Sequence, residues 1–382
     1  MGVDIVLTAY KRPEVLLQQI EAIKRQTYKI DNIFLFQDSI NSYYRIVFDD
    51  TILERFNDVY VAENNEGVWG RFRYANRISN NEYICIFDDD TIPGKKWIEN
   101  CVKEFSKVEG IYGTNGIIVK SPDKYPYDMA HVGWHKPNKK TIQVDFVGHS
   151  WFLKKAWLGY MLKKNEQYNY KYVGEDMALS FACQEIGIDT FVPPHPYDDV
   201  EKWGSIPCFG DSYGRKECGI SISVNNLAMM NQAIVNMAKG GWVFISDRDN
   251  DYLQRINNDL EAEPECFFLQ QIKNKAKGKK VYLYGAGCYG EILYRKLSRE
   301  GVEVAGFIET NRSSYTKKID GKSIEIKEPN EVIEKSSLVV LALAQRHHDE
   351  VRQKFSNNTD VLPSESIGFS YDELFESMKL TV

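Results

Sequence analysis

Short apolar segments alternate with polar loops through the first part of the chain, a pattern typical of an α/β fold. The segment 4–8 predicts a strand, and the apolar residues from Val15 to Ile23 then recur at helical spacing. The same reasoning predicts three more strands and one more helix: strands over 32–36, 58–62 and 83–87, and a helix over 70–78. The start of the chain therefore predicts an open α/β sheet.

Polar residues gather where these predicted strands end. The first strand runs into a turn that contains Tyr10 and Arg12, the second ends at Asp38, and the strand over 83–87 ends at Asp88-Asp89-Asp90. Ligands of open α/β sheets bind beyond the carboxyl ends of the strands. These loops therefore hold the first candidates for a binding site.

The rest of the chain divides by its pattern into three parts. From about 98 to 242 the pattern is less regular, with helical stretches between loops rich in proline and glycine. A charged, mostly helical segment follows, and a fresh strand over 280–284 then opens a second α/β unit. We expect one domain over 1–245, a helical connector over 246–278, and a smaller Rossmann-like α/β domain over 279–382.

The composition fits two globular domains and argues against a nucleic acid partner. A chain of 382 residues that is 43% hydrophobic is too long for one ordinary core. Its 54 acidic and 48 basic side chains give a net charge of -6, so no basic surface is implied.

Cysteine usage and the apolar segments favour a cytoplasmic protein. The seven cysteines are odd in number and include no C-x-x-C pair, which argues against a disulfide framework and against a zinc site. The N-terminal segment reads as a strand and not as a signal peptide. The longest apolar run near the end, 338–344, is far shorter than the roughly 20 residues that span a bilayer. Peripheral membrane association stays open, as does a homo-oligomer.

The three consecutive aspartates are the strongest chemical signal. On an extended strand end, Asp88 and Asp90 can converge while Asp89 faces elsewhere. Two converging carboxylates repel each other unless a cation lies between them, and Mg²⁺ or Mn²⁺ prefers oxygen ligands shared with substrate phosphates. A solvated turn or a helix cap is the competing interpretation, but the position directly after an apolar strand favours a metal site.

Three motifs occur in an order that resembles the GT-A glycosyltransferases. They are Ile5-Val6-Leu7-Thr8-Ala9-Tyr10-Lys11-Arg12-Pro13, Phe87-Asp88-Asp89-Asp90-Thr91-Ile92 and Gly174-Glu175-Asp176. The set is similar to family 2 and to the exostosin-like N-acetylhexosaminyltransferases, and it covers about residues 1–240. The chain departs from family 2 in having three aspartates in place of one D-x-D, and in lacking a recognisable Q-x-x-R-W motif. The resemblance implies that the domain over 1–245 is a GT-A type Rossmann-like sheet that binds a nucleotide sugar.

The same resemblance implies roles for the nucleotide-binding residues. Ala9, Tyr10 and Arg12 would line the base and ribose, although Tyr10 and Arg12 also suit an ordinary surface turn. Asp38 would bond the base. Arg71 would face the diphosphate or the donor sugar, with an exposed helix face as the competing interpretation.

The aspartates would contact the metal ion and the nucleotide. The resemblance implies that Asp90 contacts a Mn²⁺ or Mg²⁺ ion directly, with Asp88 toward the ribose or a metal-bound water. The resemblance also implies that Asp88 and Asp89 contact the nucleotide.

Two carboxylates farther along the chain are candidates for the catalytic base. Glu175 and Asp176 precede an apolar helical run, so they sit at a helix N-terminus, where an acid stabilises the helix as a cap. Glycosyl transfer with inversion needs a carboxylate near the acceptor hydroxyl. Asp176 is the predicted base, and capping is the alternative role.

Lone histidines are usually structural, and both His149 and His195 fall under that expectation. GT-A enzymes often draw a third metal ligand or phosphate contact from a late loop, so the resemblance makes His195 the candidate for that role.

A glycine motif opens the C-terminal unit. Gly285-x-Gly287-x-x-Gly290 follows a strand and precedes a helix, and Glu309 ends the next strand, where a ribose-binding acid is expected. The segment is short for a complete dehydrogenase. We expect a nucleotide-binding, regulatory, docking or oligomerisation module.

The sequence as a whole predicts a metal-dependent hexosyl- or N-acetylhexosaminyltransferase. It would use a nucleotide diphosphate sugar, with UDP-sugar favoured, and a saccharide or glycoconjugate acceptor in polysaccharide biosynthesis, with inversion. A nucleotidyltransferase acting on sugar phosphates is one alternative, but it would normally show a glycine-rich basic phosphate loop where Ala9 to Pro13 stands. A non-catalytic nucleotide-binding module is the other.

Overall fold

The computed structural model of the protein divides into two compact units, Met1–Glu261 and Ala262–Val382. Each is built on its own mixed sheet, so the predicted α/β class is confirmed. The residues that the structure describes are 2–10, 12–39, 50–134, 136–196, 199–205, 224–261, 269, 272–332, 337–343, 350–351, 353–355 and 360–363.

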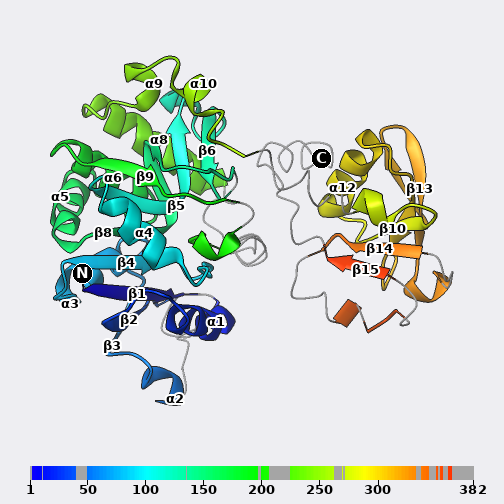
Figure 1. The fold of residues 1–382 in the computed structure, drawn as a ribbon, viewed down its shortest axis with the longest axis horizontal. Coiled ribbons are helices and arrows are strands. Elements are labelled where there is room, and N and C mark those ends of the chain that lie inside the picture. Colours follow the sequence, from blue (N-terminus) through cyan, green and yellow to red (C-terminus); the bar gives the residue numbers. More distant parts are fainter. Residues whose placement is uncertain are drawn as a thin grey trace. The chain divides into compact units, whose positions relative to one another are not determined.

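The first unit contains a nine-stranded sheet with the order β3-β2-β1-β4-β8-β5-β9-β7, in which β6 pairs with β5 (Figure 1). The strands are β1 (Val3–Ala9), β2 (Asn32–Gln37), β3 (Asp58–Val61), β4 (Tyr83–Phe87), β5 (Gly110–Val119), β6 (Met129–Gly133), β7 (Ile142–Val144), β8 (Phe146–Lys154) and β9 (Asp189–Val192). Strands β1 to β4 are parallel to one another, and β8 runs antiparallel to β4.

Helices of the first unit pack against this sheet and enclose one large apolar core. They are α1 (Pro13–Lys24), α2 (Asp50–Leu53), α3 (Gly70–Ile78), α4 (Trp97–Phe105), α5 (Leu158–Tyr168), α6 (Glu175–Gln184), α8 (Val224–Lys239), α9 (Ile245–Arg248) and α10 (Tyr252–Ile256), with short 3-10 turns η1 (Pro122–Lys124), η2 (Lys155–Trp157) and η3 (Val200–Lys202). No helix among the described residues is long and apolar enough to cross a membrane.

The parallel half of this sheet positions the site. Strands β1 and β4 are buried along their whole length, and their carboxyl ends meet at one edge because the strands pair in parallel register. Strand β8 completes the site from the other side, since Phe87 at the end of β4 lies opposite Ser150 in the antiparallel pair. The residue before Ser150 therefore faces the first aspartate.

The segment that the sequence pattern presents as irregular forms strands β5 to β8. Two glycines of β5 are places of close packing and not loop positions. A Cβ at Gly113 would lie 2.4 Å from the side chain of Val147, and one at Gly116 would lie 2.4 Å from that of Val192. The strands therefore need glycine at these positions, and a glycine-rich pattern does not predict a strand.

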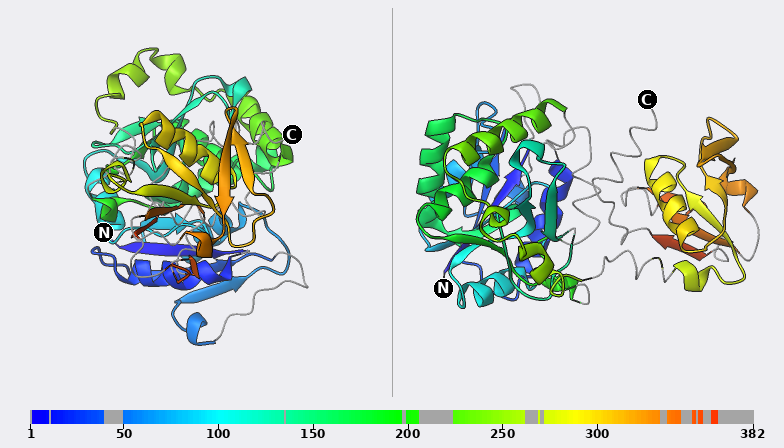
Figure 2. Two further views of the ribbon diagram at one scale, coloured as in Figure 1. Left: turned by 90° about the vertical axis from the view of Figure 1, so that its right-hand side faces the viewer. Right: turned by 90° about the horizontal axis from the view of Figure 1, so that it is seen from above.

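The second unit contains a six-stranded sheet with the order β12-β13-β11-β10-β14-β15. Its elements are β10 (Lys280–Tyr284), α12 (Cys288–Arg299), β11 (Val304–Ile308), β12 (Thr316–Ile319), β13 (Lys322–Lys327), η5 (Pro329–Glu331), β14 (Ser337–Leu341) and β15 (Asp360–Pro363). All neighbouring strands pair in parallel except β12 and β13. Helix α12, yellow in Figure 2, packs against β10 and β11.

The glycine motif of the second unit forms the turn between β10 and α12. Gly285 has a φ of 109°, in the left-handed region that favours glycine, and a Cβ at Gly290 would lie 1.9 Å from the carbonyl oxygen of Gly285. The backbone amide of Ala286 donates to Oε1 of Glu309 at 3.3 Å. The strand-turn-helix context of the motif is thus present, and nucleotide binding by this unit stays a prediction.

Replacing Gly290 with alanine should destabilise the second unit by about 1–3 kcal/mol, because the added methyl group would force the turn away from Gly285. Gly287→Ala is the matched control, since a Cβ there has nothing within 4 Å. Hydrogen exchange followed by mass spectrometry should show faster exchange only in peptides of the second unit of Gly290→Ala. Equal effects of the two substitutions would contradict this account of the turn.

Candidate active site

The candidate site is built around the turn Asp88–Thr91, called the aspartate turn below, which follows β4. The backbone amide of Asp88 and the hydroxyl of Thr91 both donate to the carbonyl oxygen of His149 on β8, each at 3.0 Å. The pairing of β4 with β8 therefore fixes the backbone from which the three carboxylates project.

Two buried arginines neutralise part of the negative charge of the turn. The guanidinium of Arg12, at the start of α1, pairs with Asp89 and lies 3.6 Å from Oδ2 of Asp90. Arg71, on α3, is paired with Oδ1 of Asp88 at 2.6 Å and with Oε1 of Glu175 at 2.8 Å. Arg71 thus joins the aspartate turn to the N-terminus of α6.

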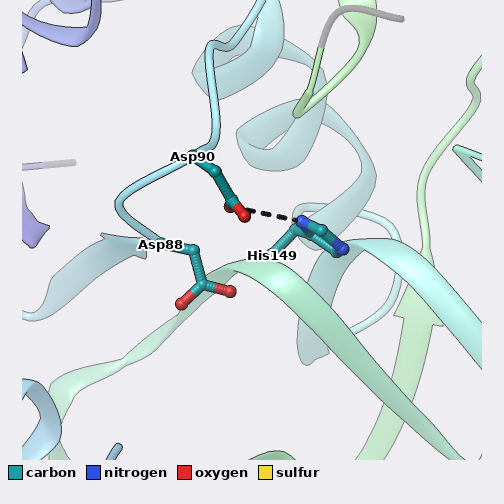
Figure 3. Close-up of side chains that lie close together, drawn as sticks. All are labelled: Asp88, Asp90 and His149. Carbon is teal, nitrogen blue, oxygen red and sulfur yellow. Dashed lines mark ion pairs between the residues drawn. The ribbon is translucent and has the colours of Figure 1, made fainter. Parts of the chain in front are cut away.

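His149 enters the site from β8 in a strained backbone conformation. Its φ is 68°, in the left-handed region that a non-glycine residue adopts at a cost of about 1–3 kcal/mol. Its ring lies edge-on to Trp134 with the ring centroids 4.6 Å apart, and Nδ1 lies 3.7 Å from Oδ1 of Asp90 (Figure 3). The strained residue is thus the one whose imidazole faces Asp90.

Asp88, Asp90 and His149 form a cluster that fits a divalent cation. One ligand atom from each lies within 4.8 Å of those of the other two. Oδ2 of Asp89 is a buried carboxylate oxygen without a hydrogen-bond partner among the described residues, and Oδ1 of Asp90 is a buried oxygen that faces the imidazole of His149. A cation satisfies a buried anionic oxygen that lacks a hydrogen-bond donor, and carboxylate and imidazole groups are both common ligands of divalent cations.

Electrostatics make Asp90 the carboxylate of the cluster that most favours ionisation. Burial opposes ionisation of Asp90, but His149 and the arginines outweigh it, so its pKa lies below the usual value. Burial raises the pKa of Asp88, against the effect of Arg71, and raises that of Asp89 to about 6. The ionised Asp90 is therefore the best anchor for a cation.

The two acids at the start of α6 have different surroundings. Glu175 is buried, and its carboxylate is engaged by Arg71. Asp176 is half-buried, and its Oδ1 accepts the backbone amide of Met177 at 2.7 Å. Burial raises the pKa of Asp176 to about 6, and burial together with Asp176 raises that of Glu175 to about 8.

The predicted nucleotide-binding residues lie at the same edge of the sheet. The carbonyl of Ala9 accepts the backbone amide of Asp38 at 2.9 Å, so the ends of β1 and β2 are tied together. Oδ1 of Asp38 accepts the backbone amide of Glu66, and the hydroxyl of Tyr10 accepts the side-chain amide of Asn65 at 2.9 Å. Burial raises the pKa of both Tyr10 and Asp38. The loop after β3 thus supports Tyr10 and Asp38.

The structure does not bring His195 to the aspartates. Its ring is fully buried, with Nε2 2.8 Å from Oγ1 of Thr114 and Nδ1 2.7 Å from the carbonyl oxygen of Pro193. Burial lowers its pKa to about 4. Both nitrogens serve hydrogen bonds that hold the loop after β9, so we correct the expectation that His195 is a metal ligand.

His149 is the histidine that lies beside Asp88 and Asp90, and the sequence predicted only a structural role for it. The position of His149 depends on the antiparallel pairing of β4 with β8. The number of residues between these two strands does not predict that they pair. A usable signal was the apolar run after Ser150, which matches a strand beside β4.

The strand order, with an acidic turn at the carboxyl end of β4, defines a domain of the GT-A type. Residues 4–168 match the model of the family described as Glycosyl transferase family 2. The chain therefore carries a glycosyl transferase family 2 domain over this segment.

Two solved structures share part of this fold. GalNAc-T7, in a structure with UDP, GalNAc and Mn²⁺, is 13% identical with a TM-score of 0.42, over 50% of this chain and 42% of that chain. TarS of S. aureus is 13% identical with a TM-score of 0.34, over 51% of this chain and 37% of that chain. The chain thus spans less than half of either protein, and similarity at this level adds nothing about function. A comparison of the sequence with curated proteins finds no match.

Replacing His195 with alanine should lower the free energy of unfolding of the first unit without affecting the aspartates. Each buried partner left without its hydrogen bond, Thr114 and Pro193, costs about 1–3 kcal/mol. Urea denaturation measures the loss, and Mn²⁺ binding followed by EPR should stay unchanged. A variant that is as stable as the wild type but binds Mn²⁺ less tightly would reinstate His195 as a ligand.

Proposed function

We propose that the protein transfers a sugar from a nucleotide diphosphate sugar to a saccharide or glycoconjugate acceptor. One observation carries the proposal: Arg71 pairs with Asp88 and with Glu175, so a candidate metal site and the helix N-terminus that carries the candidate base Asp176 meet at one guanidinium. A glycosyltransferase needs these two groups in one place, one for the departing diphosphate and one for the attacking hydroxyl.

The charge balance supports a cation as part of the site. Among the described residues, four aspartates, those of the aspartate turn and Asp176, lie near the guanidiniums of Arg12 and Arg71, and Glu175, whose pKa is about 8, lies beside them. An anionic diphosphate would be repelled by this excess of negative charge. A Mn²⁺ or Mg²⁺ ion held by Asp88, Asp90 and His149 would reverse that repulsion and neutralise charge on the departing nucleotide.

The remaining residues would bind and orient the substrates. Tyr10 and Asp38 would hold the base at the ends of β1 and β2, with Ala9 and Arg12 beside the ribose. Asp176 would accept the proton of the acceptor hydroxyl, since Glu175 is engaged by Arg71 and the carboxylate of Asp176 keeps one oxygen beyond its bond to Met177. A base on the side opposite the leaving diphosphate gives inversion at the anomeric carbon.

The proposal extends to the donor, the metal, the pathway and the location. UDP-sugar, a hexosyl or N-acetylhexosaminyl group, Mn²⁺, and a role in making polysaccharide are the assignments favoured by the motifs. A cytoplasmic location is supported by Cys85, Cys101 and Cys183, which are buried free thiols.

The direct test is incubation of the full chain with a panel of nucleotide sugars and Mn²⁺, with detection of released nucleotide diphosphate. Release that needs both the metal and an acceptor supports the proposal. Release of pyrophosphate from a nucleoside triphosphate and a sugar phosphate would favour a nucleotidyltransferase. Binding of nucleotide without turnover of any substrate would favour a non-catalytic module.

Asp90→Asn should abolish turnover, because it removes the carboxylate that anchors the cation. His149→Asn tests the third ligand, since asparagine tolerates the left-handed backbone but supplies no imidazole. It should weaken Mn²⁺ binding, measured by EPR, by at least about tenfold, the lower end of what loss of a supporting residue costs at metal sites. Wild-type Mn²⁺ affinity in both variants would remove the metal from the proposal.

Asp176→Asn should lower kcat by about 10² to 10⁴, the usual contribution of a general base, while Mn²⁺ and donor binding survive. Because burial raises the pKa of Asp176 to about 6 and only the ionised form accepts a proton, wild-type kcat should fall about tenfold per pH unit below that value. NMR of the product reads the anomeric configuration. A retained anomer would contradict inversion and leave Asp176 a residue that positions the acceptor.

A further inference from the structure

A buried glutamine lies behind the aspartate turn. Gln19 has no exposed surface and sits on the face of α1 that is otherwise apolar, which comprises Val15, Leu16, Ile20 and Ile23. Burying an amide costs free energy unless it is hydrogen-bonded. A polar residue at this position therefore needs a reason beyond core packing.

The side-chain amide of Gln19 spans the aspartate turn. Its Nε2 donates to the carbonyl oxygen of Asp88 at 2.5 Å and to that of Thr91 at 2.9 Å. Asp89 and Asp90 lie between these two carbonyls, so one amide holds both ends of the segment that carries the carboxylates. The turn is therefore held from α1 by Gln19 and from β8 by the carbonyl of His149.

Residues at the start of α1 and within it contact both the side chains and the backbone of the aspartate turn. Arg12 and Gln19 are two helical turns apart, which places them on one side of the helix. Arg12 pairs with the side chains of Asp89 and Asp90, whereas Gln19 bonds the backbone. Arg12 offsets the negative charge of Asp89 and Asp90, and Gln19 fixes the backbone of the aspartate turn.

We infer that Gln19 is a positioning residue of the metal site, which keeps the carboxylates of Asp88 and Asp90 at the spacing that a divalent cation needs. The inference rests on the proposed function, since the spacing matters only if a cation binds there. Residues that hold metal ligands in place through hydrogen bonds typically contribute about 10- to 100-fold to metal affinity.

Gln26 provides a matched control, because its amide braces the next part of the same segment. Its Nε2 donates to the carbonyl of Gly94 at 2.8 Å, and its Oε1 accepts the backbone amide of Ile98 at 3.1 Å. Neither contact involves the aspartate turn. Gln19→Met and Gln26→Met both replace a bracing amide with an apolar chain of similar length, and only the first should loosen the carboxylates.

The experiment measures Mn²⁺ affinity by EPR of the free ion, together with thermal unfolding in EDTA, for the full-length wild type and both variants. Gln19→Met should bind Mn²⁺ about 10- to 100-fold more weakly, and Gln26→Met should bind it like the wild type. Equal affinities in all three proteins, or equal losses in the two variants, would overturn the inference.

Gln19→Asn keeps the test decisive if Gln19→Met does not fold. Asparagine retains a buried amide but is one methylene shorter, so it reaches at most one of the two carbonyls and should give a smaller loss of affinity in the same direction. Unchanged Mn²⁺ affinity in a folded Gln19→Asn would then overturn the inference. A wild type that binds no Mn²⁺ would instead overturn the proposed function and the positioning role together.

Discussion

The site depends on the balance between crowded carboxylates and the two arginines that hold them. Acids of the aspartate turn and of α6 lie close together with little exposure, where like charges repel more strongly than they do in water. Arg12 and Arg71 offset that repulsion only in part. Removing one partner of such a buried pair typically costs about 3–5 kcal/mol. The arginines therefore hold the carboxylates close together, and the negative charge that remains favours binding of a cation.

The same constraint explains why distant elements meet at this place. Arg71 on α3 contacts the end of β4 and Glu175 at the start of α6, so its ion pairs link the candidate metal site to the helix that carries the candidate base. Strand β8 supplies His149 through a backbone conformation that costs free energy, and the carbonyl of that strained residue holds the turn. Strain of this kind persists where the surroundings fix it, and such places are often functional.

Local patterns predicted the parallel half of the sheet, because its strands are short apolar runs that end in polar loops. The helix Gly70–Ile78 and the strand Tyr83–Phe87 have the predicted bounds. Strand β5, in the antiparallel half, was missed because it contains glycines that close packing requires. His149 and not His195 lies beside the aspartates, because contacts across strands decide which imidazole reaches them, and spacing along the chain does not encode those contacts.

Pulsed EPR of the full-length protein with Mn²⁺ and UDP tests the central claim most directly, since it detects nuclei bound to the metal. A cation held between the aspartate turn and a nucleotide diphosphate should show a phosphorus coupling from UDP and a nitrogen coupling from an imidazole. The nitrogen coupling should disappear in His149→Asn and persist in His195→Ala. Bound Mn²⁺ with neither coupling, or a nitrogen coupling that only His195→Ala removes, would contradict the account.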